Sequence, residues 1–315
     1  MESVLKVTGP IYLLVAVGFL AIKRGWMASA DMRILGRFVA QFSLPALLFG
    51  SLARRPIAQV LHADYLAVYA AGSALSWGLT LAVSRWGLKR PLSLAAIQGM
   101  GSACSNSAFV GFPIVQQVIG PAAGVALALG ALVENLLMIP LSLMVADARM
   151  GERSRLGVLK SSFLGLLRNP MVMGIAAGLL VSSMGWPLPV VLDKAVAMLG
   201  AAAAPTALFV IGGSLVGLQI QGIRTDIVLV VGGKLLLHPL CVLGFMLLLP
   251  LADPVMRAAA LLFSAMPMMS IYAVLAQRHG HEKFCAAALL AATVCSFFTL
   301  SALIMALPPG WLPAR

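Results

Sequence analysis

The segment Gly99-Met-Gly-Ser-Ala-Cys-Ser-Asn-Ser-Ala-Phe-Val-Gly-Phe-Pro113 lies within an apolar stretch that runs from about residue 92 to residue 117. Its middle consists of small and polar residues, and Pro113 follows them. Asparagine and serine suit the residue that caps a new helix, and proline disturbs the helix that precedes it. The pattern therefore predicts a helix that breaks near Asn106. The alternative is an unbroken helix whose small residues pack against a neighbour.

A second stretch, Leu262-Phe-Ser-Ala-Met-Pro-Met-Met-Ser-Ile-Tyr272, has a proline inside an apolar run. Pro267 removes one backbone hydrogen bond and suits the first position of a new half-helix. A simple proline kink is the alternative. If both stretches break, two helix N-termini with unpaired N–H groups face the middle of the membrane and form an anion site. Unwound backbone at that depth must line a cavity, so the predicted ligand is a small carboxylate.

The composition defines the class of protein around these two stretches. The chain has 315 residues, of which 61% are hydrophobic and 10% charged, and its mean hydropathy is +1.00. Soluble domains carry about 25% charged residues, so a soluble enzyme, a nucleic-acid binder and a disordered protein are excluded. The apolar stretches are continuous, which favours an all-α polytopic membrane protein over a β-barrel. About ten spans are predicted, near 4–22, 34–52, 63–84, 92–117, 121–146, 169–186, 191–220, 226–249, 255–277 and 284–307.

Charge distribution predicts the orientation of these spans. The net charge is +12. About 15 Lys and Arg residues fall in the loops after odd-numbered spans, against about 6 on the side of the termini. The positive-inside rule then places the basic loops in the cytoplasm and both termini on the outer side of the cell's inner (plasma) membrane. Lys23 and Arg24 directly follow the first span, which favours a retained span over a cleaved signal peptide.

The two halves of the chain resemble each other when shifted by about 160 residues, which aligns Pro10 with Pro170 and Pro45 with Pro205. Five spans per half place the second half in the membrane with the opposite orientation, an inverted repeat common in secondary transporters. The predicted units are a first repeat (1–147), a basic cytoplasmic loop (148–168) and a second repeat (169–315).

Other motifs that indicate chemistry are few. The four cysteines lie inside apolar stretches without zinc-ligand spacing, so neither a metal site nor a disulfide framework is predicted. No phosphate-binding loop, H-E-x-x-H or G-x-S-x-G motif occurs. We therefore expect no enzyme activity and no cofactor.

Among the Asp, Glu, Lys, Arg and His residues, three lie deep within predicted spans, where they are costly and indicate function. Lys234 is predicted to be a substrate counter-charge or a proton site; its alternative is a structural pair with a carboxylate. Glu134 is predicted to carry the coupling proton, or to pair with Lys234, or only to bond a neighbouring helix. His238 could transfer protons, although a packing role beside Pro239 is the alternative. The Met cluster around Pro267 could line an adaptable apolar pocket or only fill the interior.

These arguments give one set of candidate site residues. The predicted substrate-binding residues are Ser105, Asn106, Ser107, Phe109, Met266, Pro267, Met268, Ser270 and Lys234. The predicted coupling residues are Glu134, Lys234 and His238.

The segment Asn106-Ser-Ala-Phe-Val-Gly-Phe-Pro113 resembles the span-4 signature of the auxin efflux carrier family. Ala265-Met-Pro267, continuing to Val274-Leu-Ala-Gln277, resembles its span-9 signature. Arg168-Asn-Pro170, Ala204-Pro-Thr-Ala-Leu-Phe209, and Lys234 followed by Pro239 extend the resemblance over nearly the whole chain. The short central segment resembles that of bacterial members.

The resemblance implies the ten-span inverted-repeat fold shared with bile acid:sodium symporters. Spans 4 and 9 would cross at Asn106 and Pro267, and spans 1, 2, 6 and 7 would form a scaffold for a mobile transport domain. Family members move organic anions, auxin in plants and malonate or other small carboxylates in bacteria. The expected function is thus a secondary carrier of a small carboxylate, with malonate as the first candidate. An auxin-like aromatic anion and a transporter-like membrane sensor are the alternatives; a homodimer is implied by resemblance alone.

Overall fold

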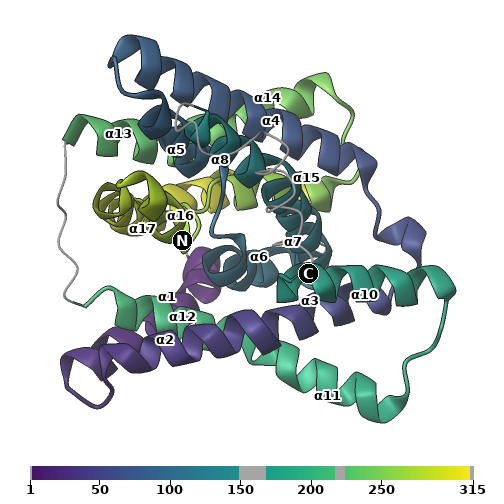
Figure 1. Ribbon diagram of the computed structural model, residues 1–315. Helices are drawn as coiled ribbons and strands as arrows, with labels where there is room; N and C mark the ends of the chain where they lie inside the picture. Colours follow the sequence, from purple (N-terminus) through teal and green to yellow (C-terminus); the bar gives the residue numbers. More distant parts are fainter. Residues whose placement is uncertain (1, 149–167, 217–223, 313–315) are drawn as a thin grey trace.

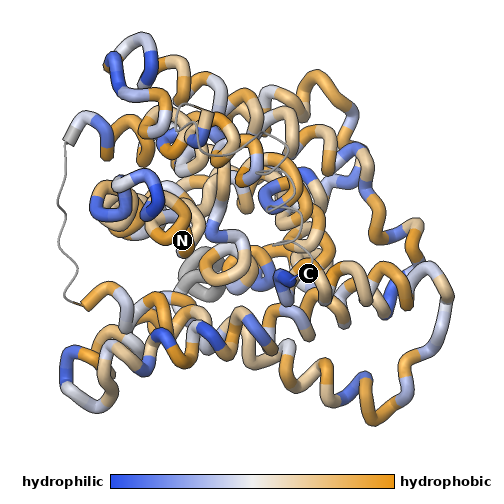
Figure 2. Tube along the Cα trace, in the orientation of Figure 1, coloured by the Kyte–Doolittle hydropathy of each residue, from blue (hydrophilic) through white to orange (hydrophobic). Residues whose placement is uncertain are grey.

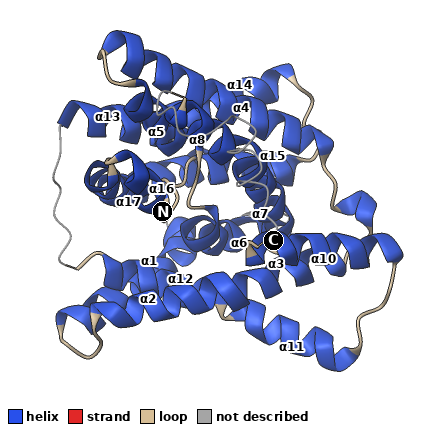
Figure 3. Cartoon of the chain, in the orientation of Figure 1, coloured by secondary structure: helices blue, strands red, loops and turns tan. Residues whose placement is uncertain are grey.

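The computed structural model describes residues 2–148, 168–216 and 224–312. These residues form helices with short connections, and no strand occurs among them (Figure 3). The prediction of an all-α protein is confirmed for this part of the chain. Apart from its two end residues, the predicted basic loop 148–168 lies outside the described residues.

Six helices in the described part of the chain are long and apolar enough to cross a membrane. They are Ser29–Ala53, Ile57–Gly87, Ala122–Asp147, Val190–Ser214, Thr225–Leu248 and Glu282–Ala306. Shorter apolar helices cover Gly9–Lys23, Ser107–Ile119, Pro170–Met184 and Pro254–Ser264. The chain is therefore a multi-pass membrane protein.

The labels of Figure 1 divide the longer helices where the backbone changes its helical type. The first half contains α1 (Glu2–Lys23), α2 (Ser29–Phe38), η1 (Val39–Ser43), α3 (Leu44–Ala53), η2 (Ile57–Gln59), α4 (Ala63–Ala82), η3 (Val83–Gly87), α5 (Leu92–Ala103), η4 (Ser107–Gly111), α6 (Phe112–Ile119), α7 (Ala122–Val133), η5 (Glu134–Met138) and α8 (Ile139–Asp147). The second half contains α10 (Pro170–Met184), α11 (Val190–Ala201), α12 (Ala203–Ser214), α13 (Arg224–Gly232), η6 (Gly233–Leu237), α14 (His238–Leu248), α15 (Pro254–Ser264), α16 (Tyr272–Ala276), η7 (Gln277–His279), α17 (Glu282–Ala306) and η8 (Pro309–Trp311).

Proline explains where most of the π-helical segments occur. The segments η1, η4, η5 and η6 each end two residues before a proline, at Pro45, Pro113, Pro140 and Pro239. Proline lacks an N–H group and its ring displaces the carbonyl one turn earlier. In each case the residue before the proline donates its N–H to the carbonyl five residues back. The turn therefore widens without breaking the helix.

The helices form two layers that face each other. One layer contains α1, α2, α3, α10, α11 and α12, which are the helices of predicted spans 1, 2, 6 and 7 (Figure 1). The other contains α4, α5, α7, α8 and the helices from α13 to α17. Contacts of α3 with α7 and of α12 with η4 and α6 join the layers. The seam between the layers is therefore lined by α3, η4, α6, α7 and α12.

Small residues let the helices of the first layer approach closely. A Cβ atom on Gly174 of α10 would lie 2.6 Å from the carbonyl oxygen of Pro45, and one on Gly178 would lie 3.0 Å from that of Phe49. Glycines at both positions allow α10 and α3 to pack backbone against backbone. Such small-residue contacts are typical of membrane helices, because lipid is as apolar as the side chains and close packing supplies the attraction.

Apolar side chains are exposed on the outside of the helical bundle, and polar side chains are buried within it. Large apolar side chains such as Val191, Leu247 and Phe298 are more than three-quarters exposed, and Figure 2 shows that apolar residues predominate along the helices. Side chains such as Ser73 and Gln98 are completely buried. This pattern fits a surrounding of lipid, in which polar groups must find their partners within the protein.

Candidate functional site

Both stretches that the sequence predicts to break are interrupted in the structure. The first helix, α5, ends at Ala103, and helical backbone resumes at Ser107 in η4. The second, α15, ends at Ser264, and helical backbone resumes at Tyr272 in α16. Each interruption leaves an irregular segment inside an otherwise helical interior.

The two irregular segments pair with each other. The backbone N–H of Asn106 donates to the carbonyl of Pro267 at 2.7 Å, and Ser105 and Met268 form an isolated antiparallel bridge. The side chain adds a second link, since Nδ2 of Asn106 donates to Oγ of Ser270 at 2.8 Å. The backbone groups freed by the breaks are thus partly satisfied by the opposite break.

Pro267 does not begin a half-helix, which differs from the sequence expectation. Helical backbone resumes five residues later, at Tyr272. The reason is that the carbonyl of Pro267 pairs with Asn106 and its neighbour Met268 joins the bridge. The segment therefore remains extended at the point where the two breaks meet. The α16 helix has only five residues, so the η4–α6 helix is the one whose N-terminus faces the site.

A cavity of about 480 Å³ lies beside the paired segments. Its lining includes Ser105, Asn106, Ser107, Phe109 and Ser270 among the predicted substrate-binding residues. It does not include Met266, Pro267 or Met268, whose side chains are buried in the packed interior. The remaining lining residues are Ala40, Gln41, Ala108, Leu127, Ala131, Glu134, Asn135, Ile139, Asn169, Pro170, Met171, Met269 and Ile271.

Amide side chains converge on this cavity. The chain contains three asparagines, Asn106, Asn135 and Asn169, and all three line it. Asn135 donates to the carbonyl of Ala131 at 2.8 Å, and the side chain of Asn169 caps α10 by accepting from the N–H of Met171 at 3.0 Å. In so apolar a chain, the placement of every asparagine around one cavity marks it as the polar centre of the molecule.

Glu134 reaches this cavity from the start of η5 and is held by three donors. Its Oε1 accepts from the backbone N–H of Ser105 at 2.9 Å and from the hydroxyls of Tyr69 and Ser107 at 3.3 Å each. The carboxyl therefore connects the first break to α4 and to η4. Its side chain is 6% exposed, which leaves it accessible only from the cavity.

Lys234 and His238 lie one helical turn apart and are fully buried away from the lining of this cavity. Nζ of Lys234 donates to the carbonyl of Ser264 at 2.5 Å and lies 2.8 Å from Nδ1 of His238. Oγ of Ser73 lies 2.9 Å from Nε2 of the same ring. The ion pairs formed by the described residues do not include Lys234.

The partner of Lys234 thus differs from the carboxylate suggested as an alternative. Ser264 is the last residue of α15, and a helix C-terminus bears unsatisfied carbonyls and a partial negative charge. The ammonium group stabilises that end of the interrupted helix. The structure brings Lys234 to the break but not to the cavity, so direct substrate contact by Lys234 and proton transfer by His238 remain predictions.

Sequence reasoning missed three polar members of the cavity wall, Gln41, Asn135 and Asn169, as site residues. The signal for Asn169 was the Asn-Pro pair that begins α10, where asparagine caps the helix and proline follows at the first position. Gln41 lies within η1, ahead of Pro45. Among the described residues, no cluster of three or more His, Cys, Asp or Glu side chains is arranged to hold a metal ion.

A membrane protein that gathers its polar groups around a cavity between interrupted helices belongs among the membrane transport proteins. Residues 3–304 match the family described as "Membrane transport protein". The chain belongs to this family, which is the auxin efflux carrier family. The resemblance inferred from the sequence motifs is thereby confirmed.

A curated relative covers almost the whole chain. It is a protein of Rhizobium meliloti (strain 1021) named "Putative malonate transporter", and it is 26% identical over 317 residues. The alignment covers 98% of this chain and 98% of the relative. The similarity therefore extends over nearly the full length of both proteins.

Proposed function

We propose that this protein is a secondary transporter of a small carboxylate, with malonate as the first substrate to test. The main support is the convergence of Asn106, Asn135 and Asn169 on one cavity beside the paired breaks. The hydroxyl group of Ser270 and the first N–H groups of the η4–α6 helix lie in the same wall. Neutral donors and a helix N-terminus suit a carboxylate ligand. The name of the relative supports malonate as the first probe.

The proton would be carried by Glu134. An anionic substrate in this cavity would lie near the only acidic side chain of the cavity wall described here. Two like charges about 4 Å apart repel by about 4 kcal/mol at a typical effective protein dielectric. A proton on Glu134 removes that repulsion, so binding of the substrate and of a proton favour each other. The carrier would then move substrate together with a proton.

The proposed mechanism is alternating access by ten spans in two inverted five-helix repeats. The layer of α1, α2, α3, α10, α11 and α12 would be the scaffold, and the other layer would move against it along the seam. This requires that the paired breaks travel with the moving layer. We further propose a bacterial inner membrane, with both termini outside and the basic loops in the cytoplasm. The homodimer stays a prediction.

An aromatic, auxin-like anion is the second candidate substrate. Phe109, Met269 and Ile271 give part of the cavity wall an apolar character, which suits an aromatic ring. A membrane sensor is the third candidate; it would bind a carboxylate without moving it across the bilayer. Competition between labelled malonate and aromatic carboxylates separates the first two candidates, and flux separates both from the sensor.

The test is uptake of labelled malonate into proteoliposomes, with unlabelled carboxylates as competitors and an imposed pH gradient. We expect saturable uptake that small dicarboxylates compete. Asn106→Ala should abolish it in a folded, inserted protein, because the link to Ser270 and the amide in the cavity wall are both lost. Lys234→Ala should also abolish uptake, because the C-terminal end of α15 loses the ammonium group that donates to the Ser264 carbonyl.

The matched control is Gln59→Ala, which truncates an amide in the exposed turn η2 and should leave uptake unchanged. Full uptake by the folded Asn106→Ala protein would refute the proposed site. An absence of any malonate flux by folded wild-type protein would refute malonate as substrate.

A further inference from the structure

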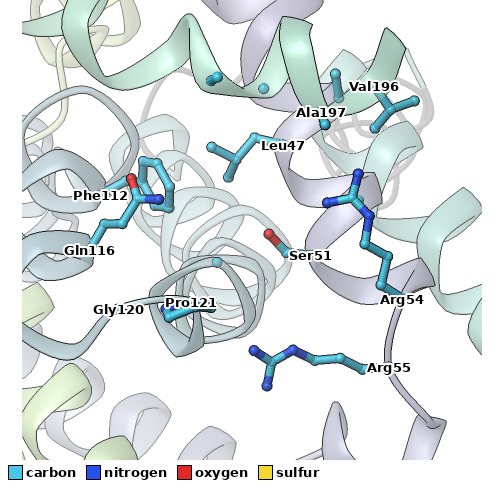
Figure 4. A pocket seen from close by; sticks show the side chains of 15 residues that line it. Leu47, Ser51, Arg54, Arg55, Phe112, Gln116, Gly120, Pro121, Val196 and Ala197 are labelled. Atoms are coloured by element: carbon cyan, nitrogen blue, oxygen red, sulfur yellow. The ribbon is translucent and has the colours of Figure 1, made fainter. Parts of the chain in front are cut away.

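A second cavity, of about 700 Å³, lies along the same seam between the layers (Figure 4). Its wall is formed by α3, α6, α7 and α11, including Ser51, Arg54, Arg55 and Gln116. In Figure 4 the side chains of Ser51 and Arg55 project into the space between α3 and the start of α7. The cavity thus contains residues from both layers, as the asparagine cavity does.

The two cavities occupy successive levels of this seam. Along the helix Ala122–Asp147, Gly124 lines the second cavity and Glu134 lines the first. Ten residues of helix correspond to about 15 Å. Along the helix Ser29–Ala53, Ser51 lines the second cavity and Gln41 the first. The second cavity therefore lies toward the end of the bundle where the loop after α3 begins.

The charge of the second cavity is positive. Its lining contains two arginines and no acidic residue. Nε of Arg54 donates to Oδ1 of Asp193 at 2.6 Å and Nη2 donates to the Asp193 carbonyl at 3.2 Å, so the Arg54 charge is paired. No carboxylate of the described residues forms an ion pair with Arg55. One cationic group therefore faces this cavity without a described counter-charge.

The backbone of Arg55 is fixed, which orients its side chain. The carbonyl of Arg55 accepts from Oγ of Ser182 in α10 at 2.6 Å, and its N–H donates to the carbonyl of Leu52 at 3.1 Å. The guanidinium group is half-buried and points toward Pro121 at the start of α7 (Figure 4). A guanidinium presents a planar fork that matches the two oxygens of a carboxylate.

We infer that Arg55 forms a second, carboxylate-binding site, which collects the anionic solute at the end of the seam opposite the asparagine cavity. This inference rests on the proposed function, because the solute at Arg55 is the same carboxylate that the asparagine cavity is proposed to transport. Ser51 and Gln116 supply neutral polar groups in the wall of the same cavity. A positive cavity with low-dielectric walls raises the local concentration of anions and the rate at which they arrive.

The transport test compares Arg55→Gln and Arg55→Lys with wild type in phosphatidylcholine proteoliposomes, with labelled malonate as the probe. Arg55→Gln should raise KM about tenfold, the size expected for loss of one charge-assisted hydrogen bond, and should change the maximal rate less than twofold. Arg55→Lys should recover part of the affinity, because it restores the charge without the planar fork. The control Lys194→Gln removes a charge from the exposed surface of α11 outside the cavity and should leave KM unchanged. An unchanged KM in Arg55→Gln would overturn the inference.

A binding arm decides the inference independently of transport. Equilibrium binding of labelled malonate is measured on detergent-purified protein. Asn106→Ala should retain a weaker, salt-sensitive site that Asn106→Ala with Arg55→Gln lacks. Equal binding by these two proteins would overturn the inference, whereas a lack of flux by wild type would refute only the proposed transport of malonate. The headgroup of an anionic lipid is the other source of negatively charged oxygens that would bind Arg55. If Arg55→Gln raises KM only in phosphatidylglycerol liposomes, the site holds lipid and the inference is overturned.

Discussion

Replacing Glu134 with glutamine tests the proposed coupling most directly, because it removes a charge and little else. Oε1 of Glu134 accepts three hydrogen bonds, from Ser105, Tyr69 and Ser107. A glutamine side chain has the same length and keeps an oxygen that can accept them. Glu134→Gln should therefore fold and still bind substrate, but it cannot gain or lose a proton.

The expected magnitude follows from the number of groups that titrate in the cavity. Glu134 is the one acidic residue in the described cavity wall, so the proposed coupling predicts one proton for each substrate. One proton moving across a difference of one pH unit is worth about 1.36 kcal/mol, which is a tenfold change in an accumulation ratio. Wild type should thus accumulate malonate about tenfold further for each unit by which the outside is more acidic.

The assay measures steady-state malonate accumulation in proteoliposomes at several imposed pH differences, with the membrane potential held at zero by valinomycin and equal potassium. Glu134→Gln should exchange labelled for unlabelled malonate, yet its accumulation should not respond to the pH difference. Glu282→Gln, which alters a carboxylate in the first turn of α17 outside the cavity, should behave as wild type. A tenfold response per pH unit in Glu134→Gln would refute the reasoning, as would a wild type without any response.

Two further changes test the packing around the breaks. Lys234→Met removes the donor to the Ser264 carbonyl, so the free energy of unfolding should fall by about 1–3 kcal/mol, the cost of leaving a buried polar group unpaired; an unchanged thermal unfolding temperature in detergent would contradict that role. Gly101→Ala would place a Cβ atom 2.6 Å from the Tyr272 ring and should cost about 1–3 kcal/mol by overpacking. Gly244→Ala, where no atom lies within 4 Å of the added Cβ, is its control and should change stability far less.

The break at Asn106 was predictable because local chemistry determines it. The small and polar residues around Asn106 favour the end of an apolar helix, whereas Pro113 only widens the turn that follows. The positions of Pro45, Pro113, Pro140 and Pro239 also indicate where helical turns widen, since each proline lies two residues after a π-helical segment. Glu134 is the first residue of one of these segments, η5. The widened turn at Glu134 is therefore associated with Pro140 in the same helix.

The partners of Lys234 and the path of Pro267 were not predictable, because both depend on contacts between distant segments. Lys234 donates to Ser264, thirty residues away, and the carbonyl of Pro267 accepts from Asn106 of another helix. Sequence patterns show that a buried lysine needs a partner, but a backbone carbonyl at a helix end has no signature in the sequence. Likewise, the sequence indicated only a topological role for Arg55, as one of the basic residues on the side of the termini. The cavity that Arg55 lines forms between two layers of helices, and the sequence of one layer does not show it.

The placement of charge along the seam explains how a carrier can bind an anion and still release it. The wall of the asparagine cavity contains no cationic side chain among the described residues, and the charge of Lys234 is directed to the end of α15 instead. A fixed cation in contact with the substrate would deepen binding in the middle of the path, whereas transport requires sites weak enough to leave. In the proposed mechanism, amide and hydroxyl donors supply that weaker binding, and a proton on Glu134 adjusts it. The one cation without a described counter-charge on this seam, Arg55, lies at the other level, where attraction speeds arrival without holding the substrate at the centre.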